Sequence, residues 1–209
     1  MTSGGWKLKG IRSYSEELGL DLRKPEDRFK WFLASILFAK RISSDIAKRT
    51  FKRFEEENLA TPRSILEAGW DRLVQVLDSG GYVRYDFSTA SNLLGISKDL
   101  LDKFGSLEEI HAKADSPRHL EKMLMEFKGV GPVGVNIFLR ELRGIWEKAN
   151  PAHSRLAVQV ARRLGVKRIG GVESQLVRIN LEHCRKSACH TCPVKTMCST
   201  RKQKARIHR

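Results

Sequence analysis

The 209-residue chain has only four cysteines, and all of them lie in one short stretch near the C-terminus: Cys184, Cys189, Cys192 and Cys198. Disulfide frameworks are typical of secreted proteins, whose chains begin with an apolar signal segment. The first ten residues, MTSGGWKLKG, lack such a segment, and no apolar run approaches the length of a membrane span. We therefore expect a cytoplasmic protein with reduced thiols and no membrane partner.

Acidic residues are scarce in the second half of the chain. Residues 1–127 hold 21 Lys and Arg against 20 Asp and Glu, whereas residues 128–209 hold 18 against 4, and no Asp follows Asp115. A short basic run can be an ordinary solvated face. An excess this large over one segment favours a polyanion partner, because phosphate neutralisation releases counterions. We expect a monomer that binds double-stranded DNA and associates with the nucleoid.

No segment alternates as a β-strand does, and the chain predicts an all-α fold. Helix starts are marked by Pro25, by Ser43 or Ser44, and by the cap-then-proline pairs at residues 61–62 and 116–117. Ser106 and Glu109 have the spacing of a capping box. A further helix is expected after Gly131 and should extend to about residue 142. Two more are expected, over residues 157–164 before Gly165 and over about residues 172–184.

The segment FKGVGPVGVNIFL, residues 127–139, has the pattern of a helix-hairpin-helix DNA-binding motif. Glycines let the backbone turn sharply and expose its amides, and a helix N-terminus can hold a phosphate without reading a base. An ordinary connection between two helices would also explain the turn. The pattern predicts phosphate contacts from Lys128, Gly129, Val130 and Gly131, with Val130 packed between the helices.

The cysteine spacing is C-x4-C-x2-C-x5-C. Four thiolates can hold a 4Fe-4S cluster or a structural zinc. Zinc sites usually carry two C-x2-C pairs, and this chain has one, at Cys189 and Cys192. We expect a 4Fe-4S cluster, with zinc as the alternative.

Together, the hairpin and the cysteines resemble the endonuclease III superfamily of DNA glycosylases. The x2 and x5 intervals match that family's cluster loop, although its first interval is usually six residues and here it is four. The resemblance implies a two-lobed helix-hairpin-helix fold. Residues 25–132 would form a helical barrel that ends in the hairpin, and residues 1–24 with 133–209 a cluster domain with a basic C-terminal tail. The cluster would hold Arg185, Lys186 and Lys195 near the DNA backbone.

Two groups that the family uses are missing. Its bifunctional members carry a lysine two residues after the hairpin, which forms a Schiff base, and Val133 stands there. Its aspartate, which stabilises the oxocarbenium-like sugar, aligns with Pro151 or Ser154. The nearest carboxylate in the sequence is Glu147. His153 is a candidate weak base near this position, or a surface or capping histidine.

Other candidate site residues lie in a polar, aromatic loop and in a basic turn. In the loop GGYVRYDFST, Tyr82 or Tyr85 would stack on a base, Arg84 would bind phosphate or a base edge, and Asp86 would act as acid or base. These residues could instead be a helix cap and the edge of the core. Lys40 aligns with the family's gap-filling glutamine, where it could also act as a nucleophile, or clamp phosphate together with Arg41.

These patterns predict a base-excision repair protein, a DNA glycosylase that lacks the usual lysine-dependent lyase step. The catalytic candidates are Asp86, Glu147 and Lys40. The alternative is a non-catalytic DNA-binding protein on the same scaffold. A zinc-bound RNA-binding module is a third, weaker interpretation.

Overall fold

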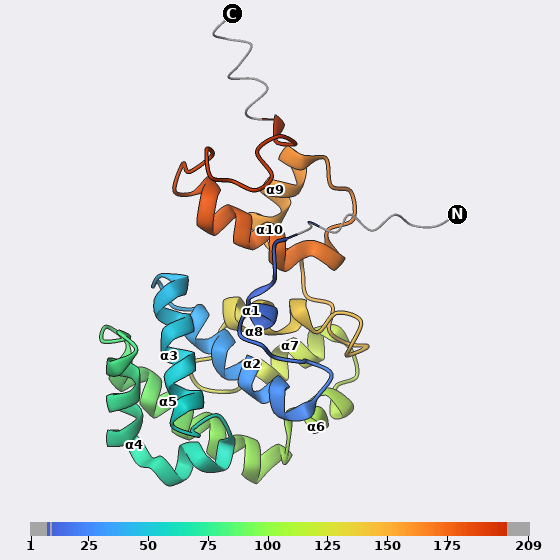
Figure 1. The fold of residues 1–209 in the computed structure, drawn as a ribbon. Coiled ribbons are helices and arrows are strands. Elements are labelled where there is room, and N and C mark those ends of the chain that lie inside the picture. The colour runs from blue at the N-terminus through green and yellow to red at the C-terminus, as the bar shows by residue number, and fades with distance from the viewer. Residues whose placement is uncertain (1–7, 9, 200–209) are drawn as a thin grey trace, which may run out of the picture. The chain divides into compact units, whose positions relative to one another are not determined.

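The computed structural model describes residue 8 and residues 10–199, and every regular element in that range is a helix (Figure 1). The β-pairing within this range is one isolated bridge between Arg143 and Trp146. The predicted all-α class is therefore confirmed. No helix of the described residues is both long enough and apolar enough to cross a membrane. The basic tail expected from residue 200 onward lies outside the described residues.

The chain forms two compact units. The larger unit comprises residues 18–151, and the smaller comprises residues 1–17 with residues 152–209. Residues 18–24 and 133–151, which the sequence pattern groups with the cluster domain, lie in the larger unit. One reason is that the indole Nε1 of Trp31 donates a hydrogen bond to the carbonyl of Phe138, at 3.2 Å. Another is that the Arg28 guanidinium donates to the carbonyls of Leu22 and Arg23, at 2.9 Å each.

The larger unit is a helical bundle built around α2. Its elements are α2 (Pro25–Phe38), α3 (Ser44–Glu56), α4 (Pro62–Ser79), α5 (Asp86–Asp99), the π-helix η1 (Leu100–Phe104), α6 (Leu107–Lys113), α7 (Pro117–Met125) and α8 (Pro132–Glu141). The α2 helix is buried along most of its length. On it, Phe32 packs against Phe138 with ring centroids 5.0 Å apart and against Phe127 at 6.0 Å. This aromatic packing anchors α8 and the residue that precedes the hairpin.

Side-chain caps start several of these helices where the sequence predicts them. The hydroxyl oxygens of Ser43, Thr61, Ser106 and Ser116 each accept a hydrogen bond from a backbone amide three residues later. Such a bond satisfies one of the amides that lack a partner in the first turn of a helix. Thr61 also forms a reciprocal capping box with Ser64. The cap chemistry of the chain therefore locates these helix starts correctly.

The smaller unit joins the N-terminal segment to the C-terminal helices. It contains α1 (Tyr14–Glu17), α9 (Arg155–Leu164), the 3-10 helix η2 (Gly170–Val172), α10 (Glu173–Ile179) and the π-helix η3 (Asn180–Cys184). The helix predicted over residues 172–184 is thus divided among three helix types. The helix α9 ends at Gly165, where the sequence predicts its end, and Gly165 has the left-handed conformation with φ 70°. Leu8 is buried in the same apolar core as Ala157, Val160 and Leu176.

Candidate nucleic-acid interface and cysteine loop

The predicted hairpin is a tight turn between α7 and α8. The Val130 amide donates to the Phe127 carbonyl at 3.0 Å, and the Val130 side chain is buried. Gly129 has φ 86°, a conformation that disfavours any side chain. A β-carbon on Gly129 would also clash with the side-chain amide of Asn92 on α5. Gly129 is therefore required by the fold of the hairpin, whatever the hairpin binds.

Pro132 and Val133, the first two residues of α8, are exposed, and the helix has no side-chain cap. Pro132 has no N–H, so a contact from this helix start would come from the amides next to it in the chain. Gly131 is the N-cap residue of α8, with φ −108°, and no atom lies within 4 Å of the position that a β-carbon on Gly131 would take. Val133 is 61% exposed, and Lys128 is exposed on the other side of the turn. A helix N-terminus carries amides without helical partners and a partial positive charge. This end of α8 can therefore accept a phosphate, with a lysine close to it in the sequence.

Two other predicted segments lie at the C-terminal end of α2, close to α8. The Tyr82 hydroxyl donates to the Leu37 carbonyl at 3.1 Å, which ties the loop of residues 80–85 to that end. A β-carbon on Gly134, in the first turn of α8, would lie 3.6 Å from the β-carbon of Ala39. The basic turn follows directly, with Lys40 half-buried and Arg41 exposed. The fold thus brings the hairpin helix, the basic turn and the polar loop to the same part of the larger unit.

Tyr82 is a core residue, and this corrects its prediction as a base-stacking side chain. Its side chain is fully buried, and burial raises the pKa of its hydroxyl well above the ordinary value. A ring without an exposed face cannot stack on a base. Tyr85 is half-buried with its ring edge toward Tyr82, and the exposed Arg84 guanidinium lies 5.5 Å from the Tyr85 ring centroid. Arg84 and Tyr85 remain candidates.

Asp86 begins α5 and is 8% exposed, and its Oδ1 accepts the amide of Phe87 at 2.7 Å. A second carboxyl, Asp78 at the end of α4, lies against it. Desolvation raises the pKa of Asp78, as do a hydrogen bond and repulsion from Asp86. Sequence reasoning missed Asp78, whose only signal was its position just before the polar loop.

An exposed aromatic pair also lies near this loop. Trp70 follows Gly69, where α4 is kinked, and its ring centroid is 5.3 Å from that of Phe87. Trp70 is 40% exposed and Phe87 is 59% exposed. The indole Nε1 of Trp70 donates to the Ser91 hydroxyl at 3.0 Å. Sequence reasoning did not single out this pair, because its members come from different helices, α4 and α5.

Glu147 lies in the exposed segment that follows α8. That segment lines a pocket of about 490 Å³, and it is held by a stack of His111 on Trp146 with centroids 4.7 Å apart. The Lys148 ammonium donates to the His111 carbonyl at 3.0 Å. Burial lowers the pKa of His111, and the charge of Lys148 lowers it further. Glu147 itself is exposed, as expected for a solvated charge at a helix end.

The smaller unit contains a buried carboxylate that sequence reasoning did not predict. Glu173, the first residue of α10, is 1% exposed. Its Oε1 accepts the Ser154 amide at 2.8 Å, and its Oε2 lies 2.8 Å from Nδ1 of His153. Ser154 is one of the two positions at which the expected aspartate is missing. The carboxylate beside it therefore comes from a residue much later in the chain.

The cysteines follow η3 in an irregular loop and form no disulfides. Cys192 is buried in the apolar core of the smaller unit, Cys184 and Cys198 pack against that core, and Cys189 is exposed. Burial raises the pKa of the Cys184 thiol, nearby Arg163 lowers it, and Cys192 and Cys198 raise it. Within the described residues, no three His, Cys, Asp or Glu side chains are grouped closely enough to hold a metal ion. The four sulfur donors suit an iron–sulfur cluster chemically, so the expected cluster remains a proposal.

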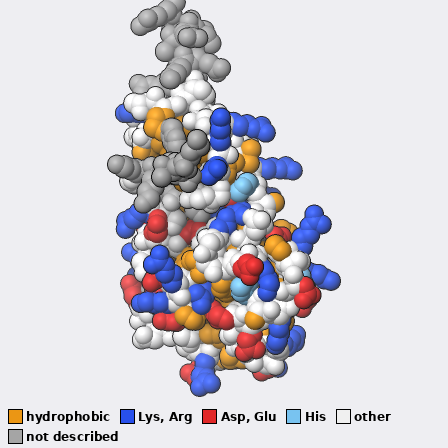
Figure 2. Space-filling model, turned by 90° about the vertical axis from the view of Figure 1, so that its right-hand side faces the viewer, with side chains coloured by type: hydrophobic (Ala, Val, Ile, Leu, Met, Phe, Trp, Pro, Cys, Tyr) orange, Lys and Arg blue, Asp and Glu red, His pale blue; other side chains and the backbone are white. Residues whose placement is uncertain are grey.

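The basic charge of the smaller unit lies on its surface, whereas its described carboxylates have internal partners. Glu16 accepts the Ser13 amide, and Glu17 and Glu182 both pair with Arg178. The exposed basic residues are Arg12, Arg155, Arg162, Lys167, Arg168, Arg185, Lys186 and Lys195. On the larger unit, basic and acidic side chains are interspersed on the face drawn in Figure 2. The described surface of the smaller unit therefore carries more basic than acidic side chains.

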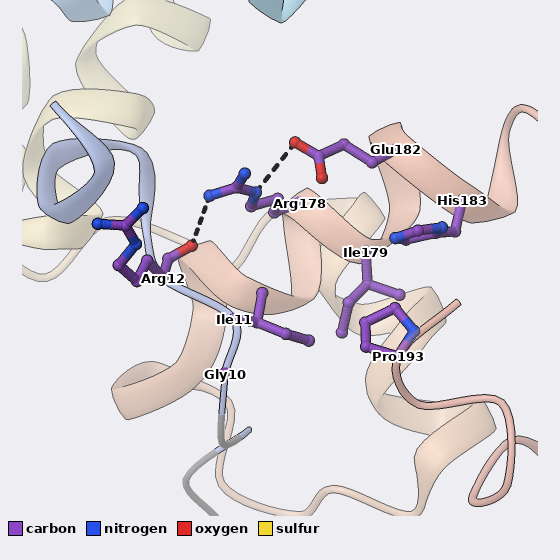
Figure 3. A pocket seen from close by; sticks show the side chains of 8 residues that line it. All are labelled: Gly10, Ile11, Arg12, Arg178, Ile179, Glu182, His183 and Pro193. Carbon is purple, nitrogen blue, oxygen red and sulfur yellow. Dashed lines mark hydrogen bonds and ion pairs between the residues drawn. The ribbon is translucent and has the colours of Figure 1, made fainter. Parts of the chain in front are cut away.

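Arg178 is a structural arginine and not part of that surface. Figure 3 shows it in a pocket of about 210 Å³, donating to Glu182 and to the Arg12 carbonyl. Its guanidinium also lies 5.1 Å from the ring centroid of Tyr14. These contacts fasten the N-terminal segment to α10 and η3. Because Arg178 donates to groups of its own unit, we do not expect it to bind phosphate as the exposed arginines would.

Comparison with the models of known protein families finds no match, and comparison with curated proteins finds no significant match. The residues and their geometry therefore carry the assignment of function.

Proposed function

We propose that the protein is a base-excision repair glycosylase that binds double-stranded DNA and hydrolyses the N-glycosidic bond of a damaged or mispaired base. The observation that carries the proposal is the hairpin, in which α8 starts at Gly131 without a side-chain cap and the exposed Lys128 lies three residues before it. Backbone amides at such a position bind phosphate in any sequence context. A repair enzyme that scans DNA needs contacts of this kind.

Electrostatics supports the same partner. The exposed basic residues of the smaller unit and the internal partners of Glu16, Glu17, Glu173 and Glu182 favour a polyanion. Counterion release would then supply much of the affinity. In the larger unit, Arg41, Arg84 and Lys128 are exposed as well, and Lys40 is half-buried. Tyr85 is the aromatic candidate for contact with an unstacked base.

A 4Fe-4S cluster is part of this proposal. Cys184, Cys189, Cys192 and Cys198 would hold it, and its role would be to fix the shape of the loop that bears Arg185, Lys186 and Lys195. Lys195 already donates to the His190 carbonyl at 3.1 Å, which orders part of this loop. We propose no redox step, because a fixed loop is enough to position basic side chains against phosphates.

The chemistry that fits the chain is hydrolysis without a Schiff base. Val133 has no amine, and its side chain is exposed at the start of α8. The Asp78 and Asp86 pair is one candidate acid or base. Lys40 is the candidate nucleophile if a covalent intermediate forms, because it is half-buried at the end of α2. Glu147 is the weakest candidate, since it is solvated.

The decisive experiment is a base-release assay on a panel of duplexes that each carry one damaged or mispaired base. Release of a free base that leaves an intact abasic strand, with no product trapped by borohydride, is the expected result. Trapping would point to an amine, and its loss in Lys40→Ala would assign that amine. Tight lesion binding without base release would support the non-catalytic alternative. Failure to bind any duplex would overturn the proposal altogether.

A further inference from the structure

His153 and Glu173 form a pair whose geometry differs from an ordinary surface ion pair. The imidazole is 40% exposed, whereas its carboxylate partner is 1% exposed, and the two are 2.8 Å apart. The chain offers a direct contrast in His119, which is also 40% exposed and lies 3.1 Å from Asp115, a carboxylate that is 88% exposed. A solvated carboxylate orients a histidine weakly, whereas a buried, hydrogen-bonded one holds it in place.

The contacts of Glu173 orient the ring of His153. One carboxylate oxygen accepts the Ser154 amide at 2.8 Å, and the other faces Nδ1 of His153. An ionised Glu173 can only accept hydrogen bonds, and beside it Nδ1 carries the proton. In the neutral ring, Nε2 then has the lone pair. The ring is therefore oriented by its partner in the tautomer that a general base requires.

The backbone around the pair is also fixed. Ser154 is the N-cap of α9, and its hydroxyl accepts the Leu156 amide at 3.3 Å. Glu173 begins α10, so its carboxylate spans the starts of two helices. The exposed Arg155 follows at the first position of α9. Arg155 is therefore a candidate phosphate contact two residues after His153 in the chain.

We infer that His153 is a catalytic residue of the proposed excision reaction, the general base that activates the attacking water, and that Glu173 is its positioning residue. The inference rests on the glycosylase function proposed above. Nε2 takes a proton from water while the water oxygen bonds to C1′ of the deoxyribose. The bond from C1′ to the base nitrogen breaks, and its electron pair leaves with the base. The base then takes up one proton, so that one water is consumed and an abasic site and a free base are formed.

Glu173 contributes by holding the imidazole through the contact of its carboxylate with Nδ1. Because the Ser154 amide fixes that carboxylate, the ring keeps its orientation while the proton is transferred. Neither an oxidant nor a metal is needed, and the proton returns from His153 to solvent or to the leaving base. The base, His153, and the residue that positions it, Glu173, thus lie at the starts of two different helices.

The test is single-turnover base release on the best substrate of the lesion panel, with the affinity for the same duplex measured in parallel. His153→Gln should slow release by roughly 10²- to 10⁴-fold, with unchanged affinity. Glu173→Gln should cause a smaller loss. The matched control, His119→Gln, should behave like the wild type, because His119 lacks a buried partner. Unchanged release by His153→Gln, from a wild type that is active, would overturn this inference and leave the glycosylase proposal standing.

One further readout separates catalysis from structural support. Added imidazole should partly restore release by His153→Ala. If the variants lose folding or DNA affinity together with activity, the imidazole experiment decides, and absence of rescue overturns the inference. A wild type that releases no base from any lesion overturns the proposed function, and this inference with it.

Discussion

The side-chain amide of Asn92 occupies the space that a β-carbon on Gly129 would need. Gly129 also has φ 86°, while Gly131, two residues later, has φ −108° and open space around it. The two glycines of one hairpin therefore have different reasons to be glycine. Gly129 is required by packing and backbone conformation, whereas Gly131 leaves the start of α8 uncovered. This difference makes it possible to separate the fold of the hairpin from its binding.

Replacement of Gly129 by Ala should destabilise the larger unit. The left-handed conformation alone costs about 1–2 kcal/mol for a residue with a side chain, and the clash with Asn92 adds to that cost. Thermal unfolding followed by circular dichroism should show a lower Tm than that of the wild type. A Tm equal to that of the wild type would mean that Asn92 and the turn rearrange without cost.

Gly131→Val should leave the Tm unchanged and weaken binding to every duplex. Its backbone conformation suits any residue, and its β-carbon meets no atom within 4 Å. The branched side chain would instead obstruct the approach of a phosphate to the first amides of α8. Fluorescence anisotropy with labelled duplexes measures the loss of affinity. If the folded variant binds DNA as tightly as the wild type, the hairpin lies outside the binding surface.

Tyr82→Phe should destabilise the protein by about 1 kcal/mol, because the buried hydrogen bond from its hydroxyl to the Leu37 carbonyl would be lost. Its affinity for DNA should not change, since the ring is fully buried. Tyr85→Ala is the matched variant. It should weaken binding to a lesion duplex by about 1–3 kcal/mol if the ring stacks on a base. Urea denaturation gives the free energy of unfolding, and anisotropy gives the affinity for DNA. Weaker DNA binding by Tyr82→Phe together with unchanged binding by Tyr85→Ala would show that Tyr82 contacts DNA.

Removal of a basic side chain from the cysteine loop should weaken binding to all duplexes similarly. Arg185→Ala or Lys186→Ala should reduce the slope of log K against log salt by about 0.9 for each phosphate that is no longer neutralised. Lys103→Ala is the control, because this exposed lysine of the larger unit pairs with Asp99 at 3.0 Å. Titrations at several salt concentrations provide the slopes. Equal slopes for all variants would contradict a phosphate contact by this loop.

Protein purified without air should be brown and carry about four irons per chain, because four thiolates are available in one loop. Cys192→Ser should lose the colour and the iron, and it should also disturb the core in which Cys192 is buried. Lys186→Ala, at an exposed position in the same loop, should retain both. Metal analysis and visible absorbance are the measurements. A colourless protein with one tightly bound zinc would replace the cluster with the alternative metal.

Local features of the sequence were enough to predict the helical class and most helix starts. Ser43, Thr61, Ser106 and Ser116 each cap a helix through contacts that span three residues, so a short stretch of chain specifies them. The left-handed glycine that ends α9 is equally local. The cysteine spacing and the charge imbalance were also visible in the chain, and they motivate proposals about a cluster and DNA that the geometry leaves to experiment.

The details of the candidate site depended on contacts between residues far apart in the chain. Tyr82 is buried in the core, where its hydroxyl donates to the carbonyl of Leu37. The sequence of its loop does not predict this burial. Glu173 approaches His153 and Ser154 only because α9 and α10 begin side by side. Helix caps depend on neighbours in sequence, whereas burial and the pairing of charges depend on how helices pack. Tertiary packing therefore decides which of several similar polar residues can take part in chemistry.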